Sequence, residues 1–303
     1  AMAEHHLQVK PGTDAWCLAA LIIFCASFAG AIDIDNMWGY YPTPLTPADN
    51  PINRHKIALG KRLFSETRLS NTGTYSCASC HQPDRHFTDG RPLAIGASGV
   101  LHSSHTPTLY NSAYNSSLGW SDSGIHTLEQ QHLIPLFNQD PVEMGYEPAL
   151  LKPLAEEADY ANLFQQAFSA DVNTHEPLIS TDNVIRALAS YVRSITAPAS
   201  AFDAYLFEDR SSALSEDAKA GMSLFFSARL GCSQCHASLS FSGPTSHTRQ
   251  TAEPVFHVTG VGGSQLAFRA PTLRQISNTA PYMHDGSLRS LTEVIEHYER
   301  TAA

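Results

Sequence analysis

Apolar side chains recur at helical spacing in several segments of the chain, and the alternation typical of strands is almost absent. In residues 52–65 they fall largely on one side of a helix that Asp49 or Asn50 would cap. Further helices are expected at 182–195, at 291–299 and immediately after Ser215. Pro- and Gly-rich stretches without such a period are expected to be loops, over 88–108 and 240–271. The pattern predicts an all-α protein with long loops.

An uninterrupted apolar stretch, residues 15–31, lies near the N-terminus. A lysine precedes it, and it ends in the small-x-small pattern of a signal-peptidase site. We therefore expect residues 1–31 to be an export signal cleaved after Ala31, which places the mature protein in the periplasm without a membrane segment. The alternative is an uncleaved membrane anchor, because about 17 apolar residues is the lower limit for spanning a bilayer. Two cysteines, Cys17 and Cys25, lie within this stretch.

The composition is that of an ordinary folded protein with two modest domains, since 43% of the 303 residues are hydrophobic and 16% are charged. The formal net charge of −10 argues against nucleic acid as a partner, because phosphate backbones bind basic surfaces. The chain has six cysteines, so four remain once the export signal is removed.

The four remaining cysteines form two Cys-x-x-Cys-His motifs, which are Cys77, Cys80 and His81 in the first and Cys232, Cys235 and His236 in the second. This motif attaches c-type haem. The two thiols add to the two vinyl groups of one porphyrin, and the adjacent His binds the iron. One alternative is a redox or zinc-binding Cys-x-x-Cys, although neither motif has a second pair of ligands at zinc spacing. Two disulfides are another alternative, and they leave both histidines unexplained. The motifs predict two covalently bound haems with iron.

Both motifs lie within an internal repeat. Gly-x-x-Leu-Phe and then Arg-Leu stand before each motif, beginning at Gly60 and at Gly221. Pro-Thr-Leu follows each motif, beginning at Pro107 and at Pro271. Each half therefore reads as a helix, a haem motif, a Pro-Thr-Leu segment, an Asp-containing turn and a second helix. We expect two cytochrome c-like haem domains, an N-terminal one over 32–205 and a C-terminal one over 206–303.

The sixth position on each iron decides what a haem can do, because the motif His supplies only the fifth ligand. Tyr298 lies seven residues after Leu291 and could bind iron through its phenolate oxygen. Seven residues after Leu128, at the corresponding place in the first half, stands Pro135, which has no ligating side chain. The repeat therefore predicts a closed second haem that stores and passes electrons, and an open first haem that binds hydrogen peroxide. A half-buried aromatic side chain is the alternative interpretation of Tyr298.

Two polar residues are candidates for the space around an open iron. Gln131 lies one helical turn before Pro135, and Glu143 follows in the next loop. A carboxylate there could move a proton between the two oxygens of peroxide, which makes the O–O bond easier to break. On sequence spacing alone, two solvated surface residues remain the simpler interpretation.

Longer motifs also surround the haem motifs, and they include Phe87-Thr88-Asp89-Gly90, Glu143-Met144-Gly145, Arg269-Ala270-Pro271-Thr272-Leu273-Arg274 and Pro281-Tyr282-Met283-His284-Asp285-Gly286. With them the chain resembles the bacterial dihaem cytochrome c peroxidase family over almost its whole mature length. Ordinary peroxidases of the family have Met where Tyr298 stands, whereas the MauG-type branch, with its methanobactin-associated relatives, has Tyr. The resemblance implies an enzyme similar to this branch, which oxidises side chains of a partner protein.

The resemblance assigns roles to individual residues of the chain. It implies that Gln131, Pro135 and Glu143 form the distal pocket of the peroxide-reactive haem. It further implies that Trp120 relays electrons between the haems and that Tyr298 is the axial ligand of the electron-storing haem.

The chain departs from the family at three places. The segment after Trp120 reads Ser-Asp-Ser-Gly, one residue longer than the Asp-Gly-Arg of the family. His105 stands where the family has an Asn that binds a bridging calcium ion, so calcium would lack this ligand. The chain also ends five residues after Tyr298, before the further C-terminal segment of the family, so we expect a truncated C-terminal domain.

Three functions fit these observations. The first is an enzyme that reduces hydrogen peroxide with electrons from a small donor protein. The second is the oxidation of a side chain on a protein substrate, as in MauG-type enzymes, which Tyr298 favours. The third is a non-catalytic dihaem electron carrier, which needs both irons closed. A histidine after the first motif would close the first haem, and the candidates are His86, His102 and His105.

Overall fold

The structure is a computed structural model that describes residues 41–139, 141–169, 177–243 and 255–301. The expected export signal, residues 1–31 with Cys17 and Cys25, lies outside the described residues. Within the described ranges, no helix is both long enough and apolar enough to cross a membrane.

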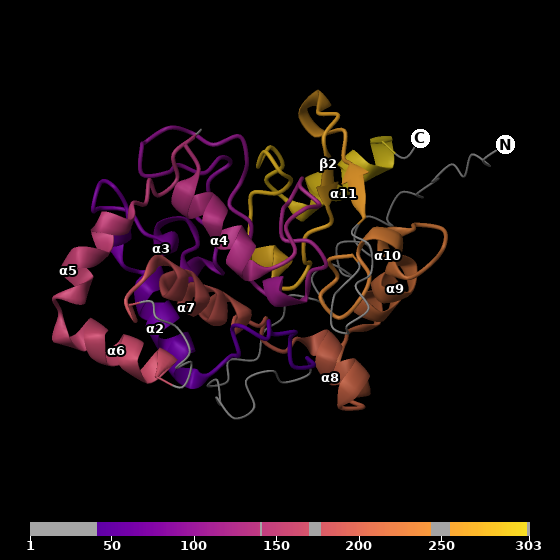
Figure 1. The fold of residues 1–303 in the computed structure, drawn as a ribbon. Coiled ribbons are helices and arrows are strands. Elements are labelled where there is room, and N and C mark those ends of the chain that lie inside the picture. The colour runs from indigo at the N-terminus through magenta and orange to yellow at the C-terminus, as the bar shows by residue number, and fades with distance from the viewer. Residues whose placement is uncertain (1–40, 140, 170–176, 244–254, 302–303) are drawn as a thin grey trace.

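The described chain is mostly helical, as the sequence predicted (Figure 1). The helices of the N-terminal part are α2 (Arg54–Phe64), α3 (Cys77–Cys80), α4 (Leu128–Phe137), α5 (Leu151–Ala155), α6 (Ala158–Phe168) and α7 (Thr181–Arg193). The helices that follow are α8 (Ala201–Phe207), α9 (Glu216–Phe225), α10 (Cys232–Cys235) and α11 (Leu291–Thr301). The described sheet is an antiparallel hairpin of β1 (Phe256–Val258) and β2 (Ala267–Arg269). Figure 1 shows α2 to α7 on the left and α8 to α11 with the hairpin on the right.

The core of the N-terminal part forms where α2 packs against α7. Leu59 and Leu63 of α2 and Val184 and Leu188 of α7 are all almost completely buried there. Helix α6 also packs against α2, and α4 packs against α7. Burial of these aliphatic side chains stabilises the contact between α2 and α7, against which α4 and α6 pack.

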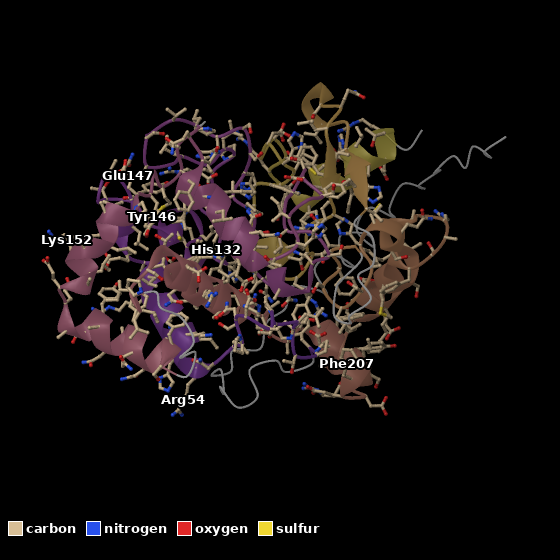
Figure 2. The ribbon with its side chains drawn as sticks, in the orientation of Figure 1. Arg54, His132, Tyr146, Glu147, Lys152 and Phe207 are labelled. Carbon is tan, nitrogen blue, oxygen red and sulfur yellow. The ribbon has the colours of Figure 1, made fainter. Side chains whose placement is uncertain are left out.

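Helix α4 is positioned by its buried face. Leu128, His132 and Leu136 are buried and lie one turn apart along it, and Figure 2 shows His132 among the central helices. The neighbouring face of α4 carries Gln131 and Pro135, which are also one turn apart. The packing of α4 on α7 therefore fixes the direction in which the candidate residues of the first site are presented.

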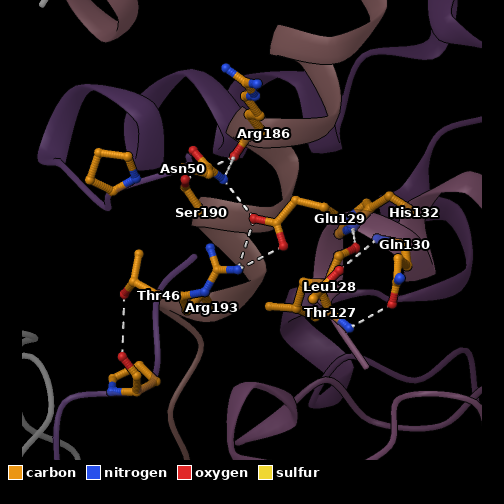
Figure 3. A network of polar contacts seen from close by, with 12 residues as sticks. Thr46, Asn50, Thr127, Leu128, Glu129, Gln130, His132, Arg186, Ser190 and Arg193 are labelled. Atoms are coloured by element: carbon orange, nitrogen blue, oxygen red, sulfur yellow. Dashed lines mark hydrogen bonds and ion pairs between the residues drawn. The ribbon is translucent and has the colours of Figure 1, made fainter. Parts of the chain in front are cut away.

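A buried polar network also ties α4 to α7 (Figure 3). Arg193 of α7 donates to both carboxylate oxygens of Glu129 of α4, at 2.9 and 3.0 Å. The Asn50 side-chain amide donates to Glu129 Oε1 at 2.7 Å and to the Arg186 carbonyl at 3.1 Å. Burial acts to raise the pKa of Glu129, but Arg193 and Asn50 outweigh it and hold this pKa below its ordinary value. Glu129 therefore stays ionised and paired.

The start of α2 differs from the sequence prediction. The helix begins at Arg54, and its cap is Asn53, whose side-chain oxygen accepts a hydrogen bond from the Lys56 N–H at 2.8 Å. Neither Asp49 nor Asn50 caps it. The Asn50 side chain is instead buried in the network that joins α4 to α7. Asn50 therefore binds Glu129 and the Arg186 carbonyl, which are distant in the sequence, and does not cap α2.

Three other helix predictions are confirmed, in α7, α9 and α11. The Ser215 hydroxyl caps α9, accepting a hydrogen bond from the Ala218 N–H at 3.1 Å. The stretch 88–108 contains no helix or extended strand, as expected. The expectation that 240–271 is entirely loop is wrong, because β1 and β2 lie within it. Strands of three residues are too short to show a readable alternation.

A fully buried ion pair fixes α8 against the segment that follows the hairpin. Arg274 Nη1 lies 2.6 Å from Asp203 Oδ2, and both side chains are 1% exposed. The Ser200 N–H and hydroxyl donate to the same carboxylate oxygen at 2.7 and 2.8 Å. Arg274 Nε also donates to the Leu239 carbonyl at 2.8 Å. These partners stabilise the buried Arg274 charge.

Replacing Asp203 with Asn is expected to lower the free energy of unfolding by about 3 kcal/mol, because it leaves the Arg274 charge buried without a counter-ion. The measurement is denaturant unfolding of the haem-loaded protein followed by circular dichroism. Asp209→Asn, at an exposed position after α8, is the control. Equal midpoints for Asp203→Asn and the control would show that Arg274 does not depend on this carboxylate.

Candidate functional site

The two Cys-x-x-Cys-His motifs adopt the same local conformation. Each pair of cysteines bounds a single helical turn, α3 or α10. The backbone N–H of His81 donates to the Cys77 carbonyl at 2.9 Å, and that of His236 donates to the Cys232 carbonyl at 2.9 Å. All four cysteines are free thiols. In the part of the chain that the structure describes, no group of three or more His, Cys, Asp or Glu could hold a metal ion. Among the described residues, the structure therefore shows neither a disulfide nor a zinc-type ligand cluster at the motifs.

Each motif histidine is oriented by a carbonyl oxygen. Nδ1 of His81 lies 3.1 Å from the Phe87 carbonyl, and Nδ1 of His236 lies 2.8 Å from the Phe241 carbonyl. Donation to a carbonyl places the ring hydrogen on Nδ1 and leaves a lone pair on Nε2, as a metal-binding histidine requires. Burial lowers the pKa of both rings, which favours this neutral form. Sequence spacing gave no sign of these carbonyl partners.

A cavity of about 430 Å³ lies beside the second motif and is lined by Cys232, Cys235 and His236 among others. Helix α11 contributes further lining residues, which are Leu291, Val294, Ile295, Tyr298 and Glu299. Most of the wall is apolar, which suits a porphyrin. Two thiols, an oriented imidazole and a phenol in one cavity fit a covalently attached haem with His and Tyr on its iron.

Tyr298 reaches this cavity from α11. Leu291, seven residues before it, is the first residue of the helix and is buried. Partial burial raises the pKa of the Tyr298 phenol, and the nearby Cys235 and Cys232 sulfurs raise it further. A free phenol at this position therefore keeps its proton, and an iron that binds the oxygen has to displace it.

Residues of the N-terminal part also line the second cavity, including Thr88, Tyr110 and Trp120. The Trp120 ring meets Phe268 of β2 edge to face, with ring centroids 6.0 Å apart. The Trp120 carbonyl accepts a hydrogen bond from the Arg269 N–H at 2.8 Å. Trp120 therefore lies where the second site meets the N-terminal part, despite the longer segment that follows it.

Around the first motif, the structure brings α4 and the Glu143 segment together. The Met144 N–H donates to the Pro135 carbonyl at 3.0 Å, which holds this segment alongside the end of α4. Gln131, one turn before Pro135, has a buried Oε1 atom with no hydrogen-bond partner among the described residues. A buried polar atom of this kind normally has a partner, so it marks a place where a small polar ligand would be held.

Glu143 lies close to the first motif. Burial is the main cause of the raised pKa values of the Cys77 and Cys80 thiols, and the Glu143 carboxylate adds to both. Burial also raises the pKa of Glu143 itself. A carboxyl group with a raised pKa is better suited to take and give a proton near neutral pH. The structure therefore places the Glu143 segment alongside Pro135 and near the first motif, while Gln131 lies one turn before Pro135 on α4.

The three candidate histidines after the first motif lie in different surroundings. His102 lies beside Glu143, with Nδ1 4.0 Å from Oε1. His86 has a left-handed backbone conformation, and its buried Nδ1 has no hydrogen-bond partner in the described ranges. His105 is buried, and its Nδ1 lies 2.7 Å from the Arg91 carbonyl. Only His102 is paired with a candidate residue of the first site.

His105 occupies the position where the family has a calcium-binding Asn. Its backbone N–H donates to the His284 carbonyl at 2.7 Å, so it joins the N-terminal part to the C-terminal part. Calcium prefers oxygen ligands, and an imidazole supplies none. The His105 position therefore offers a backbone hydrogen bond between the two parts of the chain and no side-chain oxygen for calcium.

Two histidines of the second site were missed by sequence reasoning. His257 of β1 lies with Nδ1 3.6 Å from the Cys235 sulfur. His284 stacks on Phe268 of β2, with ring centroids 4.2 Å apart. Both line the second cavity. Because the hairpin was not predicted, nothing in the sequence indicated that it would carry His257 and Phe268 to the same wall.

Comparisons with known proteins find relatives over most of the chain. The di-haem cytochrome c peroxidase family model matches residues 54–211. The chain is 37% identical to the methylamine utilization protein MauG of Methylophilus methylotrophus, over 84% of this chain and 76% of that protein. It is 31% identical to the cytochrome c551 peroxidase of Nitrosomonas europaea, over 84% of this chain and 76% of that protein. A crystal structure of a MauG-like protein associated with microbial copper homeostasis has a TM-score of 0.78 and 36% identity, covering 88% of this chain and 82% of that chain.

Proposed function

The chain belongs to the di-haem cytochrome c peroxidase family, and on that premise we propose that it is an oxidoreductase that consumes hydrogen peroxide at its first haem site. Its second haem site stores electrons and passes them to the first. Relatives that are peroxidases or MauG support the oxidoreductase activity. The different roles proposed for the two haem sites rest on the residues around each of them, above all Pro135 and Tyr298.

Two covalently bound c-type haems, one at Cys77 and Cys80 and one at Cys232 and Cys235, would supply the iron for this redox chemistry. The oriented imidazoles of both motif histidines support this assignment. The apolar cavity beside the second motif supports it as well. A calcium ion is not part of the proposal, because His105 stands at the position of its side-chain ligand.

One difference between α4 and α11 carries the proposal. Both helices begin with a buried leucine, Leu128 in α4 and Leu291 in α11. Seven residues later stands Pro135 in α4 and Tyr298 in α11. Pro135 has no ligating side chain, and its carbonyl already accepts a hydrogen bond from Met144. With haem bound, the first site would therefore keep a position for peroxide, whereas Tyr298 would hold that position in the second site.

Matching contacts around the two motifs support a duplicated unit, with haem domains over 32–205 and 206–303. The carbonyls that face the motif histidines belong to Phe87 and Phe241, and both residues have positive φ angles, 61° and 51°. A threonine in each Pro-Thr-Leu segment, Thr108 or Thr272, donates to the carbonyl of the residue before that phenylalanine. A duplicated unit accounts for these shared details.

Three residues complete the proposed reaction. Glu143 takes a proton from one oxygen of peroxide and returns it to the oxygen that departs. Gln131 orients the peroxide through its unpartnered side-chain oxygen. Trp120, at the boundary between the second cavity and the N-terminal part, lies on the route of electrons between the two sites.

The electrons come from a partner protein in the periplasm, either a small donor protein or the side chain of a protein substrate. Tyr298 and the similarity to MauG favour the second source. A non-catalytic electron carrier is the second candidate function. It is favoured by the position of His102 beside Glu143, because a histidine in the first site could close the iron.

We expect two haems per mature chain, one high-spin and one low-spin in the oxidised state, because Pro135 leaves one iron open and Tyr298 closes the other. A pyridine haemochrome assay counts the haems, and electron paramagnetic resonance assigns the spin states. One haem per chain would contradict the attachment at two motifs. Two low-spin signals would mean that a histidine closes the first haem, and would favour the electron carrier.

A further inference from the structure

The loop after the first motif is held tightly against the Glu143 segment. The Ala97 N–H donates to the Glu143 carbonyl at 2.6 Å, and the Ser98 hydroxyl donates to the Val142 carbonyl at 3.1 Å. Gly96 allows this approach, because a Cβ atom there would lie 2.4 Å from the Val142 oxygen and 2.9 Å from Glu143 Cα. Any other residue at Gly96 would push the loop away from Glu143.

The same loop turns back and brings His102 to Glu143. The His102 N–H donates to the Ala94 carbonyl at 2.8 Å, which closes the turn. The His102 ring also packs on the loop, since a Cβ atom on Gly96 would lie 2.9 Å from its Nε2. His102 Nδ1 lies 4.0 Å from Glu143 Oε1, and the two side chains are 14% and 33% exposed. The pair therefore lies at the rim of the first site.

Burial makes the pKa values of Glu143 and His102 more alike. Burial raises the pKa of Glu143 and lowers the pKa of His102, so their ordinary difference becomes smaller. Towards the first motif, Glu143 faces the Cys77 and Cys80 sulfurs, and Asp89 also acts on Cys80. Across the described ranges, no Lys or Arg forms an ion pair with Glu143. The free-energy difference for moving a proton between the two groups is therefore smaller than it is between the free side chains.

The reaction of the proposed function needs such a supply of protons. Reduction of one hydrogen peroxide to two waters takes up two electrons and two protons. The electrons come from the partner protein. Glu143 is unchanged once it has returned the peroxide proton to the departing oxygen, so the two protons that complete the second water come from solvent, and Glu143 has to receive each of them before it can pass it on. His102 is the titratable side chain that the structure places beside Glu143 at the rim.

We propose that His102 is a positioning residue that returns protons from solvent to Glu143 during the reaction with peroxide, an inference that rests on the proposed function. The His102 imidazolium gives its Nδ1 proton to the Glu143 carboxylate, so that one N–H bond breaks and one O–H bond forms without transfer of electrons. The imidazole then takes a proton from water. Because 4.0 Å is longer than a hydrogen bond, the transfer uses a side-chain rotation or one intervening water.

The test is His102→Gln in the haem-loaded protein, with His55→Gln on α2 as the control. Turnover of peroxide with an artificial one-electron donor should fall about tenfold at neutral pH. This loss is smaller than the roughly 100-fold or greater loss expected when Glu143, the acid–base group itself, is removed. The dependence of the rate on a histidine ionisation should disappear. In a Glu143→Gln background, His102→Gln should add no further loss, because His102 acts through Glu143. The control should match the parent protein.

An infrared titration of the Glu143 carboxyl gives a second readout that does not depend on turnover. Without the positive charge of His102, Glu143 should take up its proton at a higher pH in the variant. An unchanged titration together with an unchanged pH profile overturns the proposal. Conversion of a low-spin first haem to high-spin in His102→Gln also overturns it, because His102 would then be an iron ligand. A parent protein that does not react with peroxide rejects the proposed function instead.

Discussion

Replacing Glu143 with Gln is expected to slow the reaction with hydrogen peroxide by about 100- to 10,000-fold while both haems stay attached. Gln has the same size and can still form hydrogen bonds, but it cannot take or give the proton. The bond from the Met144 N–H to the Pro135 carbonyl holds the segment in place through backbone atoms, so the variant leaves it intact. The loss should therefore report proton transfer rather than a change of fold.

The pH dependence of the rate should change in the same variant. Burial raises the pKa of Glu143 above the ordinary value of 4.5. The carboxylate is the form that accepts a proton, and it is lost as the pH falls through this raised pKa. The parent rate should therefore decline on the acid side at a pH above 4.5, and Glu143→Gln should not show this decline.

Stopped-flow mixing with peroxide across this pH range is the measurement. Glu147→Gln is the matched control, since Glu147 lies four residues further on, is exposed and lies at the outer edge of the molecule in Figure 2. The control should react as fast as the parent protein. A Glu143→Gln protein that is equally fast would remove Glu143 from the reaction.

Helices with a strong apolar period and a local cap could be predicted from the sequence. In α9 the Ser215 hydroxyl caps the first turn, and in α7 Ser180 does the same, so local signals and the fold agree. The start of α2 could not be predicted, because Asn50 found buried partners in α4 and α7. Helices α5 and α8, with five and seven residues, are too short to show a period.

The sequence predicted those features of the candidate site that depend only on the spacing of residues close together in the chain. The two Cys-x-x-Cys-His motifs are contiguous in the sequence, and Gln131 and Pro135 are one turn apart on α4, so all of these could be identified without knowledge of the fold. The contact between His102 and Glu143 could not be predicted, because it depends on a loop that packs across the chain through Gly96. The same holds for His257, which reaches Cys235 only because the hairpin folds over the second motif.

Replacing Tyr298 with Met is expected to raise the reduction potential of the second haem by a substantial part of the roughly 0.8 V range that axial ligands span. An anionic phenolate donates charge to the iron and stabilises its oxidised form, whereas the neutral thioether of Met raises the potential. The Tyr298 phenol lines the same cavity as Cys232, Cys235 and His236. The reaction of the first site with peroxide should change much less, because Gln131 and Glu143 are untouched.

The state in which the protein holds both oxidising equivalents of peroxide should also become shorter-lived in Tyr298→Met. Storing an oxidising equivalent at the second site is easier when its potential is low, so a higher potential makes that state a stronger oxidant. Redox titration gives the potential, and rapid-scan spectroscopy after addition of peroxide gives the lifetime. Tyr146→Phe, which removes a buried phenol oxygen from the N-terminal part, is the control. If Tyr298→Met matches this control in both measurements, Tyr298 is not a ligand. Another group must then close the second site, and His257, which lines the same cavity, is the first candidate.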